Sequence, residues 1–433
     1  MALAARLAKG SLYYGWYIVA VAFMIGLVSP GLISSTPQVF LKPMTEELGW
    51  NRGFFSLAVS LGGLLSAPLA LWVGPIIDRR GARGPMLIAG LLIGAAFIGL
   101  GLVQTKWQFL VLRSAMAPLA MAGLGQLATQ VTVSNWFVKK RGRALAITAM
   151  GMSTGWTVVP PLATYLIATL GWRQAWMVLG LLAWALVLAP AWLIVKRRPE
   201  DIGLLPDGGP TVTPSETQRR PAPEVTWTRQ EAVRTPALWL LAFSLPLGMM
   251  GMSAITQHLY SYVTDMHFSQ ATAATVTMTI YLVAVAIKLP WGFVAERVSP
   301  RYCLATVFFV LGLGLGLLVL SGDNRIALYV VAGLLGAFWG GIPPLQGLLW
   351  AGFFGRMSLG RVQSLAMLVS AAFTPLGPVL AGYLWDVTGT YRNVFTYYMV
   401  PSVAAGVLLL LARPPRKKAA PETGAPTASV AVG

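Results

Sequence analysis

Long apolar runs alternate with short polar segments along most of this chain. Six runs lie before its midpoint, at residues 16–38, 53–77, 84–104, 107–134, 144–169 and 174–195. Six more follow, at residues 237–264, 271–295, 302–321, 326–351, 363–386 and 394–412. The runs are apolar on all sides, and each is about as long as a helix that crosses the roughly 30 Å hydrocarbon core of a bilayer. The pattern predicts an all-α membrane protein with twelve transmembrane helices.

The polar segment 196–236 is far longer than the others and divides the chain near its middle. It is rich in Pro, Gly, Thr and Arg, a composition typical of a flexible linker. We therefore expect an N-terminal six-helix half (1–195), a cytoplasmic linker (196–236), a C-terminal six-helix half (237–412) and a disordered cytoplasmic tail (413–433).

The last part of the linker carries a signal for the start of a helix. Thr228 stands three residues before Glu231, which is the spacing of a capping box. Trp227 precedes them, and tryptophan is common at the interface between membrane and water. We expect a short surface helix that leads into the seventh span, with Trp227 as an interfacial anchor.

Charged residues are few and unevenly placed. They make up 11% of the chain, against about 25% in a soluble domain, and the net charge is +18. Of the 32 lysines and arginines, 24 fall in alternate segments that include both termini, 6 in the other loops, and 2, Arg113 and Lys288, inside spans. By the positive-inside rule both termini are cytoplasmic, and a bacterial inner membrane is the expected location. The positive charge therefore indicates topology and not a nucleic-acid partner.

The sequence contains no recognisable motif for catalysis or for metal or cofactor binding. It has one cysteine, Cys303, and two histidines, His258 and His267. A Gly-Lys phosphate loop, a nucleophile elbow and a cluster with zinc-ligand spacing are all missing. We expect a monomeric protein that is not an enzyme, that needs no cofactor and no metal, and whose main partner is the lipid bilayer.

Two loops have matching sequences. GPIIDRRGAR (Gly74 to Arg83) follows the second span, and GFVAERVSPR (Gly292 to Arg301) follows the eighth, 218 positions later. Further positions repeat at this offset or one beyond it: Arg143 and Arg361, Pro160 and Pro378, Arg173 and Arg392. Several matches in one register predict two six-helix halves related by a parallel repeat.

Asp78 and Glu296 lie in these loops, just past the cytoplasmic ends of their spans. A carboxylate there can cap the N-terminus of a neighbouring helix and hold adjacent arginines. In a protein that alternates between two states, such contacts can form in one state and break in the other. The expected latch comprises Gly74, Asp78, Arg79, Arg83, Glu296, Arg297 and Arg301. The alternative is that these residues only anchor the loops to lipid headgroups.

Small and helix-bending residues gather in the fifth and eleventh spans. Gly151, Gly155 and Pro160 lie in the fifth, and Gly377 and Pro378 in the eleventh. Such residues allow close packing and bending, which we expect where the two halves meet. A static kink is the alternative for each of them.

Residues that serve one substrate should differ between the halves. Lys288 has Ala70 at its repeat position, and Arg113 has Val331. A cation inside a span costs at least about 3 kcal/mol, so each is a functional candidate unless it extends to the headgroups. No Asp or Glu lies in the middle of a predicted span, so the cavity should be electropositive and favour a small organic anion. Arg113 would draw anions to the external entrance.

Other polar and aromatic side chains in the spans are further candidates for substrate binding. Tyr281 precedes Lys288 by seven residues and shares its helix face. The amides of Gln126 and Gln346 would be costly in lipid and should line the cavity. Weaker candidates are Ser35 and Trp339.

His258 is the candidate for proton coupling. Tyr262 and Asp265 follow it at four and seven positions, so the three residues share a helix face. This face could pass a proton from the outside, with His258 and Tyr262 also touching the substrate. It could instead be a passive external gate.

GPIIDRRGAR resembles the signature loop of the major facilitator superfamily, which implies the major facilitator fold and transport by alternating access. YGWYIVAVAF (14–23), RRPEDIGLLPDG (197–208) and KLPWGFVAER (288–297) resemble its bacterial monocarboxylate and oxalate/formate porter branch. In that branch, the position four residues before Gly292 is typically an arginine that binds the substrate carboxylate. Lys288 keeps the charge without the bidentate fork. The branch often has an acid one turn earlier, where this chain has Ala284.

These observations predict a secondary transporter of a small monocarboxylate or dicarboxylate, with Lys288 as the main anion contact. Proton symport and anion exchange both remain open. A drug or amphiphile exporter is the first alternative, since the chain has 16 tryptophans and 17 methionines. A membrane sensor that does not transport is the second.

Overall fold

The computed structural model describes residues 12–208, 226–374 and 376–415, and the regular elements in these ranges are all helical. The N-terminal half contains α2 (Gly15–Pro30), η1 (Gly31–Ser35), α3 (Thr36–Leu48), α4 (Arg52–Arg80), α5 (Arg83–Gly101), α6 (Lys106–Val111), η2 (Leu112–Met116), α7 (Ala117–Leu124), α8 (Gln126–Trp136), α9 (Arg141–Leu170) and α10 (Trp172–Leu193). The linker contains η3 (Pro199–Ile202), η4 (Pro206–Gly208) and α11 (Arg229–Val233). The C-terminal half contains α12 (Pro236–Asp265), α13 (Gln270–Ala286), α14 (Lys288–Ala295), α15 (Pro300–Leu320), α16 (Arg325–Trp339), α17 (Ile342–Phe354), η6 (Arg356–Ser358), α18 (Leu359–Phe373), α19 (Leu376–Thr388) and α20 (Tyr391–Leu411).

The helices account for the twelve predicted spans. Nine segments in the described ranges are long and apolar enough to cross a membrane, and the bent pair α13–α14 makes ten. The other two are α4, with 29 residues, and α9, with 30, both rich in Gly and Ser or Thr. At 1.5 Å per residue, each exceeds the roughly 30 Å core of a bilayer. The predicted fold class is confirmed.

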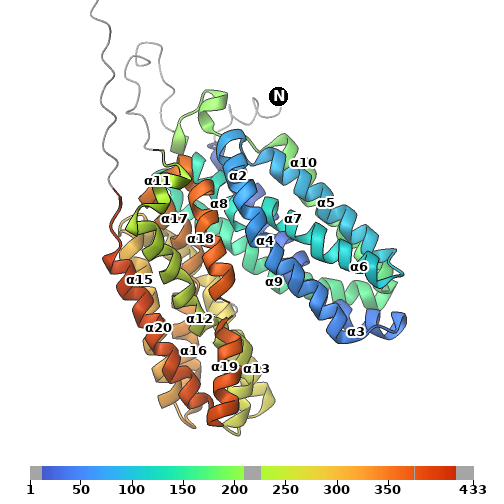
Figure 1. Cartoon of the computed structure of the whole chain (residues 1–433), viewed down its shortest axis with the longest axis vertical. Helices are drawn as coiled ribbons and strands as arrows, with labels where there is room; N and C mark the ends of the chain where they lie inside the picture. Colours follow the sequence, from blue (N-terminus) through green and yellow to red (C-terminus); the bar gives the residue numbers. More distant parts are fainter. Residues whose placement is uncertain (1–11, 209–225, 375, 416–433) are drawn as a thin grey trace, which may run out of the picture.

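Figure 1 shows two bundles, the N-terminal half in blue to green and the C-terminal half in yellow to red. They lie close together at the end that carries α11 and α17, which we call the linker end. They diverge toward the opposite end, where α3 and α6 of one half face away from α13 and α19 of the other (Figure 1). The two halves are therefore closest to each other at the linker end.

Glycines in α9 allow its backbone to touch that of α2. A Cβ on Gly151 or Gly155 would lie within 3.0 Å of the carbonyl oxygen of Phe23 or Leu27, respectively. The expectation that both glycines lie between the halves is therefore wrong, because α2 belongs to the same half. Because these positions lack side chains, the first and fifth spans pack backbone to backbone inside the N-terminal bundle.

Breaks in the eighth and tenth spans pack against each other. The axis bends by 41° between α13 and α14, where Pro290 lacks the N–H that would bond to Ala286. The tenth span is interrupted between α16 and α17, at two glycines. A Cβ on Gly340 would collide with the backbone of Ala284, so the two breaks fit only because this residue is glycine. Lys288 is the first residue after the bend.

The described parts of the linker are packed on the bundle. The predicted capping box is confirmed, since Thr228 and Glu231 exchange hydrogen bonds with each other's backbone N–H groups. Trp227 is 6% exposed and its ring packs against Phe354, so it is not an interfacial anchor. Residues 209–225 of the expected flexible linker, and 416–433 of the expected tail, lie outside the described residues.

The close contact of α9 with α2 leads to a prediction about stability. Gly155→Ala should lower the unfolding free energy by about 1–3 kcal/mol, because the added methyl group overlaps the Leu27 backbone. Thermal unfolding of the purified protein in detergent measures the effect. Gly333→Ala is the matched control, since a Cβ there meets open space and helix propensity favours alanine. Equal melting temperatures for both variants would contradict the prediction.

Candidate functional site

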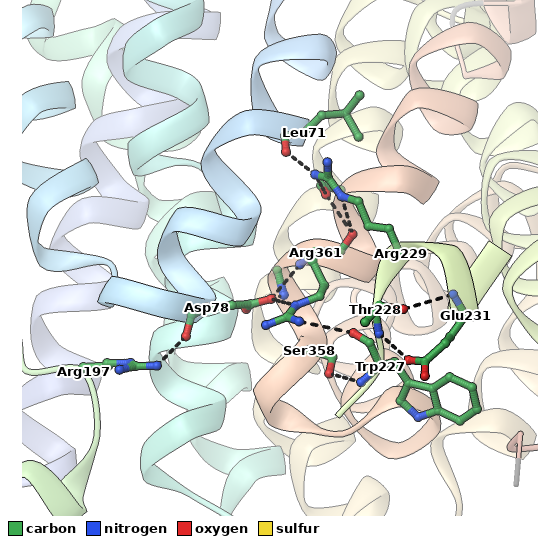
Figure 2. A network of polar contacts seen from close by, with 11 residues as sticks. Leu71, Asp78, Arg197, Trp227, Thr228, Arg229, Glu231, Ser358 and Arg361 are labelled. Atoms are coloured by element: carbon green, nitrogen blue, oxygen red, sulfur yellow. Dashed lines mark hydrogen bonds and ion pairs between the residues drawn. The ribbon is translucent and has the colours of Figure 1, made fainter. Parts of the chain in front are cut away.

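At the linker end, Asp78 of the N-terminal half caps a helix of the C-terminal half. Its Oδ1 accepts a hydrogen bond from the backbone N–H of Gly360 (2.9 Å), and its Oδ2 accepts from the N–H of Arg361 (2.9 Å). The Arg361 guanidinium also donates Nε–H to Oδ2 at 3.1 Å, and the Asp78 side chain is fully buried (Figure 2). These contacts satisfy N–H groups at the start of α18 and place a negative charge there.

Glu296 makes the repeat-related contact in the opposite direction. Its Oε1 accepts from the backbone N–H of Arg143 at 3.1 Å and from the Arg143 Nε–H at 3.0 Å. Asp78 and Glu296 are 218 positions apart, as are Arg143 and Arg361. Each half therefore supplies an acid for the arginine of the other.

Four glycines let the halves approach at the same level. A Cβ on Gly360 would lie 2.5 Å from the carbonyl oxygen of Gly74, and one on Gly292 would lie 2.7 Å from that of Gly142. These pairs also obey the 218-residue offset. We call the eight residues the cross-half cluster: Gly74, Asp78, Gly142, Arg143, Gly292, Glu296, Gly360 and Arg361.

The other four residues of the expected latch lie elsewhere. Arg79 and Arg297 are exposed. The Arg83 guanidinium lies over the Trp192 ring, and Arg301 donates to the carbonyl oxygen of Ala412 (2.6 Å). The acids thus hold arginines of the opposite half and not the adjacent ones. Arg79 directly follows Asp78 but is exposed, whereas the helix N-terminus that Asp78 caps belongs to the other bundle.

The linker adds contacts that sequence reasoning missed. Arg229, from the first turn of α11, donates hydrogen bonds to the carbonyl oxygen of Leu71 in one half and to that of Arg361 in the other (Figure 2). Trp227 donates its backbone N–H to Ser358 Oγ at 2.6 Å. Burial lowers the pKa of the Arg229 guanidinium, and the Asp78 charge opposes this shift. The only sequence signal was the neighbouring capping box.

Glutamines bridge the halves deeper in the molecule. Gln126 Nε2 donates to Gln346 Oε1 at 3.4 Å, so these two predicted residues meet. Gln130 donates to the Pro343 carbonyl oxygen (3.0 Å) and accepts from Gln363 Nε2 (2.9 Å). Gln363 was not a candidate, since one polar residue in a span carries little information about its partner.

Lys288 is 4% exposed and lies at the bend of the eighth span. Its ammonium donates to Ser153 Oγ in α9 at 2.8 Å and to the carbonyl oxygen of Ala284 at 3.1 Å. The first contact crosses from the C-terminal to the N-terminal half. No ion pair found among the described residues includes Lys288. Within the described ranges the hydrogen-bond partners of the ammonium are neutral oxygen atoms, and at 4% exposure Lys288 does not extend to the headgroups.

Arg113 is also 4% exposed, and it donates to the carbonyl oxygen of Ile33 in η1. Its side chain is therefore buried inside the protein here, and a role in attracting anions stays a prediction. Arg113 lies in η2 and Ile33 in η1, and both segments are π-helical.

The remaining candidates lie in two places. Tyr281 and Trp339 meet edge to face, with ring centroids 5.6 Å apart. The Ser35 hydroxyl donates back to the carbonyl oxygen of Gly31, inside its own helix. Sequence spacing alone did not reveal either contact.

His258 ties three helices together at the divergent end. Its Nε2 lies 3.2 Å from the Pro378 carbonyl oxygen, which can only accept, so Nε2 carries the proton. Its Nδ1 lies 3.1 Å from the Tyr391 hydroxyl, which can donate or accept. Tyr262 turns away, donating to the Leu318 carbonyl oxygen (3.0 Å), and Asp265 is exposed at the end of α12. Both nitrogens of the His258 imidazole therefore make hydrogen bonds that join α12 to α19 and α20.

The sequence matches one protein family along nearly its whole length. The model of the Major Facilitator Superfamily matches residues 18–287 and again residues 263–432. Among curated proteins, the oxalate:formate antiporter of Oxalobacter formigenes is 23% identical, with 94% of this chain and 95% of that protein covered. The gallate transporter of Pseudomonas putida is 25% identical, with coverage of 86% and 91%. A probable L-galactonate transporter of Escherichia coli is 22% identical, with coverage of 80% and 78%.

One solved structure with the same fold is the proton:xylose symporter XylE bound to 6-bromo-6-deoxy-D-glucose. Its TM-score is 0.68 at 12% sequence identity, with 92% of this chain and 95% of that chain covered. At this identity the similarity shows the fold alone.

The cross-half cluster leads to a prediction about the linker end. Asp78→Ala should increase the accessibility of that end roughly tenfold or more, because three hydrogen bonds to a buried carboxylate are lost. The rate of maleimide labelling of Ser364→Cys, introduced into Cys303→Ser protein, measures this accessibility, since Ser364 is fully buried beside Gly74. Glu47→Ala is the control, because Glu47 pairs with Arg173 inside one half. An unchanged labelling rate in Asp78→Ala would rule out a role for Asp78 in closing this end.

Proposed function

Since this chain belongs to the Major Facilitator Superfamily, we propose that it carries a small organic anion across the membrane by alternating access, with Lys288 as the main anion contact. It is a multi-pass transporter of this superfamily, and the relatives named above include carriers of organic acids. The uneven lysine and arginine distribution supports cytoplasmic termini. The similarity to carriers of Oxalobacter formigenes and Pseudomonas putida supports a bacterial inner membrane.

The buried charge of Lys288 is the observation that carries the proposal. An ammonium group in the middle of a membrane protein is costly unless a negative charge or water accompanies it. Among the residues that the structure describes, only Ser153 Oγ and the Ala284 carbonyl oxygen bind it. A substrate carboxylate would supply the missing charge and would leave with the substrate, which a permanent acidic partner cannot do.

The cross-half cluster supports a latch that closes the cytoplasmic end. In the observed state, Asp78 and Glu296 cross between the halves while the opposite ends diverge (Figure 1). Rocking of the halves would break both contacts and admit water to Lys288 from the cytoplasm. Because Lys288 itself bonds across the halves to Ser153, an anion that competes for its ammonium would alter the same interface.

We propose exchange of anions as the coupling mode. Ala284 stands where an acid would partner the cation, and both nitrogens of His258 are engaged in structural hydrogen bonds. We therefore expect no coupled proton at either position. Proton symport is the alternative that the transport experiments below would reveal.

The charge of Lys288 should be essential to transport. Lys288→Ala should reduce carboxylate uptake into proteoliposomes at least tenfold, because a lost partner for a buried carboxylate costs about 2 kcal/mol or more. Lys288→Arg should retain part of the uptake, since it keeps the charge. Lys106→Ala, which removes an exposed lysine outside the site, should behave as wild type. Equal uptake by Lys288→Ala and Lys288→Arg would refute the role of the charge.

The coupling mode has its own test. Uptake of labelled carboxylate should accelerate severalfold when unlabelled carboxylate is loaded inside the vesicles, and an inward proton gradient should have little effect. His258→Gln should behave in the same way, because its amide can also donate to Pro378 and accept from Tyr391. Acceleration by protons that disappears in His258→Gln would establish symport through His258 instead.

A further inference from the structure

A cavity of about 160 Å³ lies mainly in the N-terminal half, beside α18 of the other half. Residues of α2, α4, α7, α8, α9 and α18 line it. Three methionines, Met121, Met152 and Met367, contribute side chains from three different spans. Methionine side chains are flexible and polarisable, so such a surface adapts to apolar groups of varied shape.

The lining of the cavity offers no charge. None of its fourteen lining residues is ionisable, and several of their polar groups already form hydrogen bonds with other protein atoms. Ser29 donates to the sulfur of Met121 (3.4 Å), and Thr129 donates to the carbonyl oxygen of Gln126 (3.1 Å). The Gln126 amide donates across the halves to Gln346. Dispersion contacts therefore dominate what this cavity can give to a ligand.

α9 contributes both to the cavity and to the contact with the cation. Met152 lines the cavity, and the next residue, Ser153, accepts the hydrogen bond from Lys288 at 2.8 Å. Consecutive residues of a helix point about 100° apart, so the cavity and the ammonium lie beside different faces of α9. A ligand that uses both must extend around this helix, with a charged end at the ammonium and an apolar end in the cavity.

We propose that the transported anion is a monocarboxylate whose apolar body is about the size of a benzene ring, with the body in this cavity and the carboxylate at Lys288. This inference rests on the proposed anion transport and narrows its substrate class. An apolar cavity of about 150 Å³ in another protein holds benzene, so the volume suits a single ring or a branched aliphatic group. A second carboxylate in the cavity would lose its hydration without gaining a cationic partner, which disfavours compact dicarboxylates.

Titration calorimetry of the purified protein with benzoate, formate and oxalate tests the substrate class without interference from passive membrane permeation. Benzoate should bind at least tenfold more tightly than formate or oxalate. Ala122→Phe, which places a ring in the cavity, should weaken benzoate binding at least tenfold and leave formate binding within about threefold. Met278→Ala, an exposed methionine outside the cavity, is the matched control.

A second variant tests the same inference independently, in case Ala122→Phe does not fold. Met121→Ala enlarges the cavity and should shift the preference from benzoate toward 2-naphthoate. Formate or oxalate binding more tightly than benzoate would overturn the inference, as would an equal loss of benzoate and formate affinity in Ala122→Phe. Both results would leave anion transport standing, whereas failure of all three acids to bind would count against the proposed function itself.

Discussion

The buried ammonium of Lys288 is the feature on which the rest of this structure depends. It lies at a proline-induced bend in the eighth span, it bonds to an oxygen of the opposite half, and it has no acidic partner among the described residues. A protein retains such an unfavourable charge when the charge has a function. The same position joins anion recognition to the interface between the halves, because Ser153 belongs to α9 and Lys288 to α14.

The interface itself is built by repetition. Asp78 with Arg361, and Glu296 with Arg143, are the two copies of one contact, and the glycine pairs that permit it are copies of one close approach. The linker makes the two copies unequal, since Arg229 reinforces only the side that contains Asp78 (Figure 2). Closure at the linker end is therefore a property of both halves, with the linker as a third component on one side.

The sequence allowed much of this architecture to be predicted. Hydropathy located the twelve spans, and the 218-residue repeat singled out Asp78 and Glu296. The repeat could not identify the partners of these two acids, because an acid at a helix end can pair with several arginines and only the tertiary structure selects one. Arg113 shows a similar limit: its contact with Ile33 of the first span is a tertiary contact that periodicity does not predict. The cavity lined by Met121, Met152 and Met367 could not be predicted either, since these residues come together only in the folded bundle.

The central claim is that the protein recognises a negative charge in its substrate. The most direct measurement is the affinity of the purified protein for a carboxylate and for the neutral amide of the same acid, such as benzoate and benzamide, by titration calorimetry at low ionic strength. The two ligands have nearly the same shape, so a difference in affinity reports the charge. The account predicts saturable binding of the carboxylate and at least a tenfold weaker binding of the amide. Equal affinities for the two ligands would contradict it.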